Sequence, residues 1–192
     1  MAVRRYLAVA VVLLATAAAV ITLTVGHHPR LQPRLAAQAG TAAPVPDDVD
    51  YAQMMIAHHA QAVQMSKELL DRPGLPDRIG DIARFIVADQ QREIDQLTAW
   101  LAAWHLDTGG EHEHGMLSAA DLVRLQKAPT AQAVPLYLRL MIEHHRGAID
   151  MSWVLLNGGG QNVFIHSTAK HVINEQTAEI DAMTSLLESA QA

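Results

Sequence analysis

The sequence predicts an all-α protein, a four-helix bundle of two duplicated antiparallel hairpins with one transmembrane helix ahead of it. A long segment occurs twice without a gap, its apolar residues recur with the period of a helix, and the alternating β-branched runs of strands are absent. Two hairpins that each carry one apolar stripe bury those stripes best against each other, as a four-helix bundle.

Residues 1–26 are the predicted membrane segment. Arg4 and Arg5 precede an uncharged apolar run, Leu7 to Val25, which is long enough to cross a bilayer. Basic residues ahead of the run predict that the N-terminus stays inside and that the rest of the chain is exported. We interpret the run as an uncleaved signal-anchor of a single-pass membrane protein. Cleavage near Ala37-Gln38-Ala39 is the alternative, and it would make the protein secreted.

Residues 27–46 are rich in Pro, Ala and Gln and show no apolar period, so we expect a flexible tether there. Residues 47–192 then form one domain of ordinary size. The formal net charge is −6 and the basic residues are scattered, which argues against a nucleic-acid partner. The chain has 0 cysteines, so a site for a soft metal ion has to use its 8 methionines and 11 histidines.

The duplicated unit gives repeat 1 over residues 47–105 and repeat 2 over 130–192, with a linker over 106–129. At one constant offset, Tyr51 to Ser66 aligns with Tyr137 to Ser152, and both copies keep a Met, a His-His pair and a second Met. A shared offset over so long a stretch indicates a duplication.

Each repeat is expected to fold as helix, turn, helix. In repeat 1, Asp47 or Asp48 is the expected N-cap of the first helix, Arg72-Pro73-Gly74 ends that helix, and Asp77 caps the second.

In repeat 2 the turn is Gly158-Gly159-Gly160, and the return helix is expected from Ile165 to Leu187. Within the linker, Ser118-Ala-Ala-Asp121 has the form of a capping box that opens a short helix through Lys127.

Met and His side chains share one face of the first helix in each repeat, because they are spaced by three and four residues. The set consists of Met55, His58, His59, Met65, Met141, His144, His145 and Met151. Soft and borderline metal ions prefer thioether and imidazole ligands, so the doubled pattern favours metal binding. The alternative is a hydrogen-bonded histidine pair with methionine as ordinary core packing.

A Gln and a Glu on each return helix are expected at the height of the histidine pair. Counting back from each turn places Gln90 and Glu93 beside the first pair, and Gln176 and Glu179 beside the second. The glutamates could be metal ligands, or they could hold the imidazole N–H groups.

The linker carries further donors in His112, His114 and Met116. A His-x-His-x-Met segment flanked by glycine could wrap a metal ion, and it could equally be a solvated loop. His105, His166 and His171 are outside the repeated set, so we expect them to be ordinary surface or boundary residues.

The doubled motif Met-Ile-x-His-His-x-x-Ala-[Val/Ile]-x-Met, with Gln-x-x-Glu-Ile on each return helix, resembles the domain of unknown function 305 family. The step Gly115-Met-Leu-Ser118 is similar to that family too, and the resemblance covers residues 47–187. It implies a ferritin-like four-helix fold, export or membrane anchoring and, from some members, copper and silver binding and resistance outside the cytoplasm. It also implies that the eight Met and His of the doubled motif are candidate ligands, with His112, His114 and Met116 as additions.

Three functions remain open on the sequence. The first is a non-catalytic protein that binds Cu(I) or Ag(I) for buffering, transfer or resistance, with a copper donor or acceptor protein as a partner. The second is a ferritin-like di-metal carboxylate protein that oxidises or stores iron with Asp89, Glu93, Glu175 and Glu179, although no Glu-x-x-His motif occurs in either repeat. The third is a structural or partner-binding bundle. No nucleophile or substrate-binding motif is visible, so no enzyme is predicted.

Overall fold

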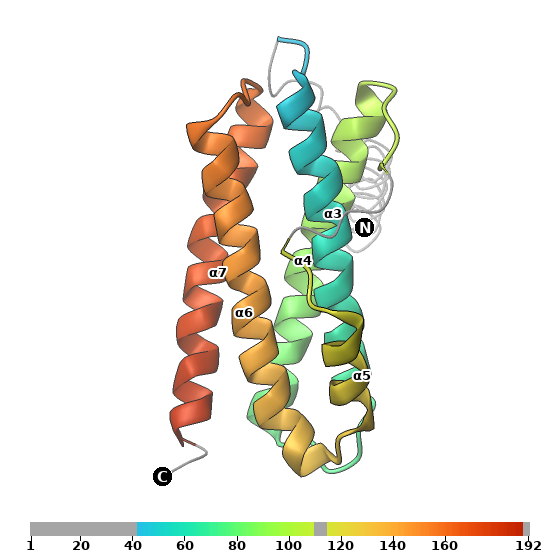
Figure 1. Cartoon of the computed structure of the whole chain (residues 1–192), viewed down its shortest axis with the longest axis vertical. Helices are drawn as coiled ribbons and strands as arrows, with labels where there is room; N and C mark the ends of the chain where they lie inside the picture. The colour runs from blue at the N-terminus through green and yellow to red at the C-terminus, as the bar shows by residue number, and fades with distance from the viewer. Residues whose placement is uncertain (1–41, 110–114, 190–192) are drawn as a thin grey trace, which may run out of the picture. The chain divides into compact units, whose positions relative to one another are not determined.

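The computed structural model describes residues 42–109 and 115–189, and these residues are all-helical, with no strand among them (Figure 1). This confirms the predicted all-α class. The five helices are α3 (Pro46–Leu70), α4 (Asp77–Ala103), α5 (Ala119–Lys127), α6 (Thr130–Asn157) and α7 (Val163–Ser189).

The expected membrane segment, residues 1–26, and most of the expected tether lie outside the described residues. None of the helices in the described ranges combines the length and the apolarity that crossing a bilayer requires.

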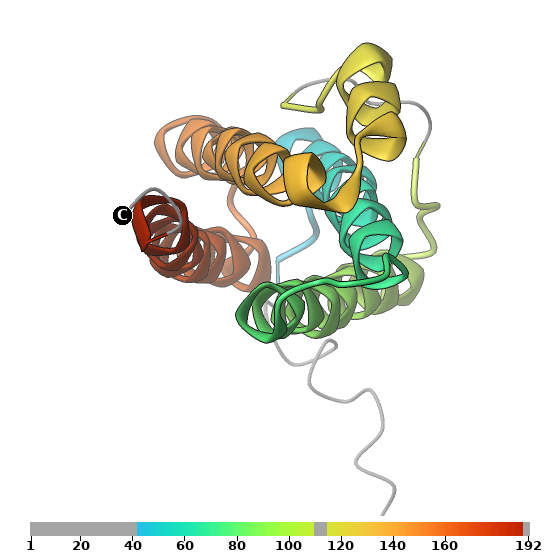
Figure 2. The ribbon, with the colours of Figure 1, turned by 90° about the horizontal axis from the view of Figure 1, so that it is seen from below.

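Four long helices pack as two hairpins, α3 with α4 and α6 with α7, and the hairpins meet mainly through α3 and α6 (Figure 2). Two buried hydrogen bonds show that α3 and α6 are antiparallel. The Tyr51 hydroxyl bonds the Ser152 hydroxyl at 2.9 Å, and the Ser66 hydroxyl bonds that of Tyr137 at 2.7 Å. Because Tyr51 aligns with Tyr137 and Ser66 with Ser152, the two bonds are related by a pseudo-twofold axis.

The N-cap of the first helix of repeat 1 lies two residues before Asp47, the earlier of the two expected caps. Val45 is the N-cap and Pro46 the first helical residue, where its missing N–H costs nothing. Asp48 is instead the third residue of α3, and its carboxylate accepts the Val45 amide at 3.0 Å and the Asn162 amide at 3.1 Å. This buried carboxylate therefore ties the start of α3 to the segment that precedes α7.

Two other helices also differ from expectation at their ends. The return helix of repeat 2, expected from Ile165 to Leu187, is two residues longer at each end, as α7 runs over Val163–Ser189. Asp77 is the first residue of α4 and not its cap, because Pro76 holds the N-cap position in an extended conformation. The short linker helix starts as predicted, with the Ser118 hydroxyl accepting the Asp121 amide at 3.2 Å.

The apolar core consists of two clusters with a polar layer between them along α3 and α6. Met65 and Met141 belong to one cluster, and Met55 and Met151 belong to the other. The layer that separates them is made of buried polar side chains, namely His58, His59, Gln90, Glu93, His144, His145, Gln176 and Glu179. Each cluster thus takes one methionine of the doubled motif from each repeat.

Candidate metal centre

The second histidine of each pair is hydrogen-bonded to the glutamate of its own return helix. His59 Nε2 lies 2.6 Å from Glu93 Oε2, and His145 Nε2 lies 2.6 Å from Glu179 Oε2. All four side chains are buried. The expectation that each hairpin brings its histidines to the height of a glutamate is confirmed, because a short turn sets the register of the two helices in each hairpin.

The first histidine of each pair turns to the other hairpin. The rings of His58 and His144 stack with their centroids 3.6 Å apart and their planes at 29°. These two residues occupy equivalent positions in the two repeats, so their stack lies at the pseudo-twofold axis between α3 and α6. The sequence does not reveal this contact. Counting residues from a turn predicts which residues lie at the same height within one hairpin, but not which residues of the two hairpins meet.

The buried imidazoles of repeat 2 are held in the neutral form. Burial, followed by repulsion from His58, moves the pKa of His144 well below its usual value. Burial and His59 lower the pKa of His145 to about 3, although the main chain of Met141 and the charge of Glu93 act in the opposite direction. A neutral imidazole keeps one nitrogen lone pair, which is the form that binds a metal ion.

The carboxyl group of Glu179 titrates in an unusual range. Burial raises its pKa to about 8, and the negative charges of Asp89 and Glu93 act in the same direction, while His59 opposes them. A carboxyl and an imidazole that share a short, buried hydrogen bond therefore remain a net-neutral pair over the physiological range of pH.

Several buried polar atoms of this layer make no hydrogen bond within the described residues. They include Nδ1 of His59 and His145 and both ring nitrogens of His144. Metal-binding histidines usually donate the other ring N–H to a carboxylate or a backbone carbonyl, and the His59–Glu93 and His145–Glu179 pairs have that arrangement. The donor set of this layer therefore suits a metal ion that accepts imidazole nitrogen.

The two glutamines lie in the polar layer as expected, but they do not bond the histidines. Both side-chain polar atoms of Gln90 and the Oε1 atom of Gln176 are buried without a hydrogen bond in the described residues. They complete the layer at the same height, and their polar atoms add to its unused hydrogen-bonding capacity.

The methionines of the motif flank this layer. Met55 precedes His59 by one turn of α3, and Met141 precedes His145 by one turn of α6. Both methionines are fully buried, and Met65 and Met151 are nearly so. The antiparallel pairing of α3 and α6 puts Met55 level with Ala148 and Met141 level with Ala62, and each pair belongs to one cluster. Because alanine is small, Ala148 leaves room for the Met55 side chain, and Ala62 leaves room for the Met141 side chain.

The linker approaches this centre at His58. Nε2 of His58 lies 3.0 Å from the carbonyl oxygen of Gly115, and Gln61 bonds the main chain of Leu117. Met116, one of the additional candidates, lies between these two contacts and is half-buried. The other two, His112 and His114, lie outside the described residues.

His171 is a residue of this region that the repeat pattern did not select. It is on the surface, as expected, yet its Nε2 lies 3.6 Å from Glu93 Oε1. The equivalent position in repeat 1 is Phe85, so within the described part of the chain Glu93 has a second imidazole and Glu179 has none at the equivalent place. Helical spacing puts His171 on the same face of α7 as Glu175 and Glu179, but it does not reveal the contact with Glu93, which belongs to α4.

The carboxylates do not assemble into a di-metal site. Among the described residues, no group of three or more His, Asp or Glu side chains is placed to hold a metal ion. Asp89 forms an ion pair with Arg92, and Glu93 and Glu179 each bond a histidine. These carboxylates therefore bond other side chains in the metal-free chain.

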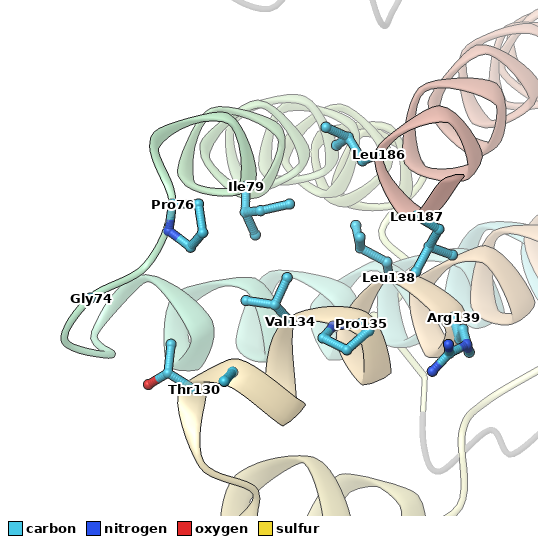
Figure 3. A pocket seen from close by; sticks show the side chains of 11 residues that line it. Gly74, Pro76, Ile79, Thr130, Val134, Pro135, Leu138, Arg139, Leu186 and Leu187 are labelled. Atoms are coloured by element: carbon cyan, nitrogen blue, oxygen red, sulfur yellow. The ribbon is translucent and has the colours of Figure 1, made fainter. Parts of the chain in front are cut away.

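A cavity of about 650 Å³ lies elsewhere, at the end of the bundle that holds the α3–α4 turn (Figure 3). Its walls are mainly apolar and come from the α3–α4 turn, the starts of α4 and α6 and the end of α7, including Ile79, Val134, Leu138 and Leu187. None of the repeated histidines or methionines lines it, and aliphatic side chains do not bind metal ions, so we place the candidate centre in the polar layer.

A family model described as "Domain of unknown function (DUF305)" matches residues 48–187. The chain belongs to this family. The match spans both repeats and the linker between them, so the whole described bundle is the DUF305 domain. No protein with a curated description matches the chain.

Several solved structures are similar to this DUF305 chain. A DUF305 fragment from Deinococcus radiodurans is 28% identical, with a TM-score of 0.71 over 77% of this chain and 99% of that one. A DUF305 protein from Streptomyces coelicolor is 28% identical, with a TM-score of 0.70 over 76% and 94%. CopM in the Cu(I)-bound form is 26% identical, with a TM-score of 0.63 over 76% and 98%.

Proposed function

We propose that this DUF305 protein is a non-catalytic, extracytoplasmic metal-binding protein that holds Cu(I) or Ag(I) for buffering, transfer or resistance. Its ligands are the paired Met and His side chains of the doubled motif, and copper is its cargo. In this proposal residues 1–26 anchor the domain to the membrane, and a second protein delivers or receives the metal.

The observation that carries this proposal is the pair of equivalent His–Glu contacts. In each, one ring nitrogen bonds a buried carboxyl at 2.6 Å. The other is buried without a well-formed hydrogen bond within the described residues, although His145 has a contact with the main chain of Met141 that raises its pKa. A buried polar atom without a partner costs roughly 1–3 kcal/mol, so a protein gains by giving these nitrogens a ligand role. A core built only for stability would gain more from apolar side chains at the same positions.

Two further observations support a soft metal as the cargo. The polar layer is flanked by four buried methionines, and the chain has 0 cysteines, so thioether and imidazole are its soft donors. The similar structures include CopM with Cu(I) and CopM with silver, the latter 25% identical with a TM-score of 0.58.

The test is an anaerobic titration of the full-length chain with Cu(I) against a chromogenic chelator, with Fe(II) run in parallel. We expect tight uptake of Cu(I) and little of Fe(II). The double variant His59→Ala/His145→Ala should lose more than the roughly 10–100-fold in affinity that is typical of removing an outer partner of a metal ligand. His105→Asn, at an exposed position in the described chain, is the matched control and should bind as the wild type.

A second double variant tests whether a loss of binding in His59→Ala/His145→Ala comes only from a loss of folding. Glu93→Gln/Glu179→Gln keeps the shape of the layer and should weaken Cu(I) binding by roughly 10–100-fold, because the amide orients imidazole less well than a carboxylate. Unchanged Cu(I) affinity in both double variants would place the metal elsewhere. Iron uptake with oxidation would favour the di-metal class, and no uptake of either metal would favour a structural or partner-binding bundle.

A further inference from the structure

The linker crosses the bundle at a position where the two repeats differ. Gln61 of α3 aligns with Gly147 of α6 in the repeat, and the linker step Gly115–Leu117 contacts both residues. The His–Glu bond of the polar layer occurs twice, once in each repeat. The linker is present once, so it can act on one copy of the motif only.

Gly147 is required for the linker to lie this close. A Cβ atom added at Gly147 would lie 2.9 Å from the carbonyl oxygen of Gly115 and 3.0 Å from its Cα. Gly115 itself has φ of 73°, in the left-handed region that favours glycine. Two glycines thus allow the main chain of the linker to pass directly over α6.

Gln61 holds the same linker step from the other helix. Its side-chain N–H donates to the Leu117 carbonyl at 3.2 Å, and its side-chain oxygen accepts the Leu117 amide at 2.8 Å. Both bonds are buried, and together they fix the position and orientation of the main chain two residues after Gly115. No equivalent contact can form on α6, where Gly147 has no side chain.

The consequence of this contact appears at His58. Its Nε2 lies 3.0 Å from the Gly115 carbonyl oxygen. A carbonyl can only accept, so Nε2 carries the proton, and the lone pair of the neutral ring is on Nδ1. His58 therefore has the same type of outer partner that Glu93 gives His59. His144, its equivalent in repeat 2, has no carbonyl of the linker as a partner. Its contact with the main chain of His58 raises its pKa, but neither ring nitrogen has the geometry of a full hydrogen bond within the described residues.

We propose that Gln61, Gly147 and Gly115 are positioning residues of the metal centre and that they make its two copies unequal. The copy in repeat 1 has both imidazoles oriented for a metal ion, one by the linker and one by Glu93. The copy in repeat 2 has only His145 oriented in this way. The repeat-1 copy, with His58 and His59, therefore binds the first Cu(I) ion more tightly. This inference rests on the proposed function for its copper-binding step.

The affinity test uses two variants that release the linker and one matched control for each. Gln61→Leu removes both bonds to Leu117, and Gln64→Leu makes the same change at an exposed position of α3. Gly147→Ala displaces the Gly115 carbonyl, whereas Gly80→Ala meets only the flexible side chain of Arg84, at 3.1 Å.

In the wild type we expect two classes of Cu(I) site, the tighter of which disappears in His59→Ala and the weaker in His145→Ala. Gln61→Leu and Gly147→Ala should weaken the tighter class by roughly 10–100-fold and leave the weaker class unchanged. Both controls should retain two distinct classes. Two equal sites in the wild type, or an equal loss at both sites in the linker variants, would overturn the proposal.

A measurement without copper separates this proposal from the proposed function. Imidazole nitrogen NMR shifts of the metal-free chain should show His58 as a single tautomer with the proton on Nε2, and a mixture of tautomers in Gln61→Leu and Gly147→Ala. Hydrogen exchange at the Leu117 amide should accelerate in the same two variants. A mixed His58 tautomer in the wild type would overturn the positioning role. A chain that shows the single tautomer but takes up no Cu(I) would refute the copper function and leave the positioning role established.

Discussion

His144 differs from the other three histidines of the motif because neither of its ring nitrogens forms a well-aligned hydrogen bond within the described residues. His59 bonds Glu93, His145 bonds Glu179, and His58 bonds the Gly115 carbonyl. His144 instead stacks on His58 and is buried. Such a ring gains nothing from a proton, because the positive charge would be desolvated and would face a second imidazole 3.6 Å away. The native packing of the bundle therefore requires His144 to be neutral.

The metal-free protein should be most stable near pH 6.5. The unfolded chain protonates His144 and His145 below their usual pKa of 6.5, while the folded chain keeps them neutral, so each lowers stability by about 1.4 kcal/mol per pH unit as the pH falls. Glu179 acts oppositely: in the folded chain it stays protonated up to about pH 8, so its contribution to stability falls as the pH rises from 4.5. Between pH 4.5 and pH 6.5 the two histidines change the free energy of unfolding more than the one glutamate does, so stability falls as the pH falls.

Thermal unfolding midpoints measured with a chelator present, from pH 5 to pH 8.5, test this profile. We expect the midpoint to fall on both sides of the maximum. His105→Asn should keep the profile, since His105 is exposed. A midpoint that does not change between pH 5 and pH 6.5 would mean that the histidines of repeat 2 are protonated equally in the folded and unfolded chains.

The two tyrosine–serine bonds of the α3–α6 contact should differ in strength despite their symmetry. Tyr137→Phe leaves the fully buried Ser66 hydroxyl without its bond and should lower the free energy of unfolding by about 1–3 kcal/mol. Tyr51→Phe should cost less, because the Ser152 hydroxyl keeps its 2.8 Å bond to the Ala148 carbonyl. Urea unfolding of both variants measures the two values, and a larger loss for Tyr51→Phe would contradict this explanation.

At the scale of elements, the linker helix α5 is attached at its C-terminal end by one side chain. The Arg72 guanidinium donates to the main-chain carbonyls of Ala128 at 2.5 Å, Leu125 at 2.7 Å and Gln126 at 3.0 Å. These carbonyls lie at the end of α5, where only that of Leu125 accepts a main-chain amide, from Ala128 at 3.3 Å. A cation there gives them a donor and complements the helix dipole. Arg72 thereby connects the turn of the first hairpin to the linker.

Replacing Arg72 with Met should release α5 while keeping the apolar stem of the side chain. We expect faster amide hydrogen exchange in Ala119–Lys127, with α3 and α4 little affected, because the lost bonds lie at the edge of the bundle. Arg124→Met is the control, since its ion pair with Asp121 is at the surface and should contribute at most about 1 kcal/mol. Equal exchange rates in wild type and Arg72→Met would show that packing alone holds α5.

At the scale of the whole molecule, the domain has two apolar clusters separated by a layer that is costly to bury. The hairpins meet mainly through α3 and α6, so this layer lies in the principal contact between the two halves of the chain. A ligand that binds this layer in the native state only should stabilise the whole bundle.

Cu(I) should therefore raise the thermal unfolding midpoint of the domain. At a free Cu(I) concentration of about 100 times Kd, the gain in free energy of unfolding is about 2.7 kcal/mol. Differential scanning calorimetry under anaerobic conditions measures it, with Fe(II) as the comparison. Glu93→Gln/Glu179→Gln should show a smaller shift at the same Cu(I) concentration. A midpoint that Cu(I) leaves unchanged, in a protein shown to bind it, would place the ion outside the polar layer.

What the sequence predicted correctly follows from local geometry. The helical class, the hairpins and the approach of His59 to Glu93 and of His145 to Glu179 depend on a period and on short turns. The His58–His144 stack, the His171–Glu93 contact and the linker contact at Gln61 depend on how separate elements are placed in three dimensions. The helix starts at Pro46 and Asp77 were missed because proline geometry took precedence over aspartate as a cap.

The antiparallel contact between α3 and α6 has a further consequence. Each of its tyrosine–serine bonds joins a Tyr of one repeat to a Ser of the other, and each repeat carries both residues. One hairpin alone is therefore self-complementary: its Tyr51 matches the Ser66 of a second copy, and the reverse, as in a closed twofold dimer. The domain has the internal organisation of a homodimer whose two subunits were fused into one polypeptide. The linker between the two repeats has no counterpart in either of them, and it is the linker that contacts His58.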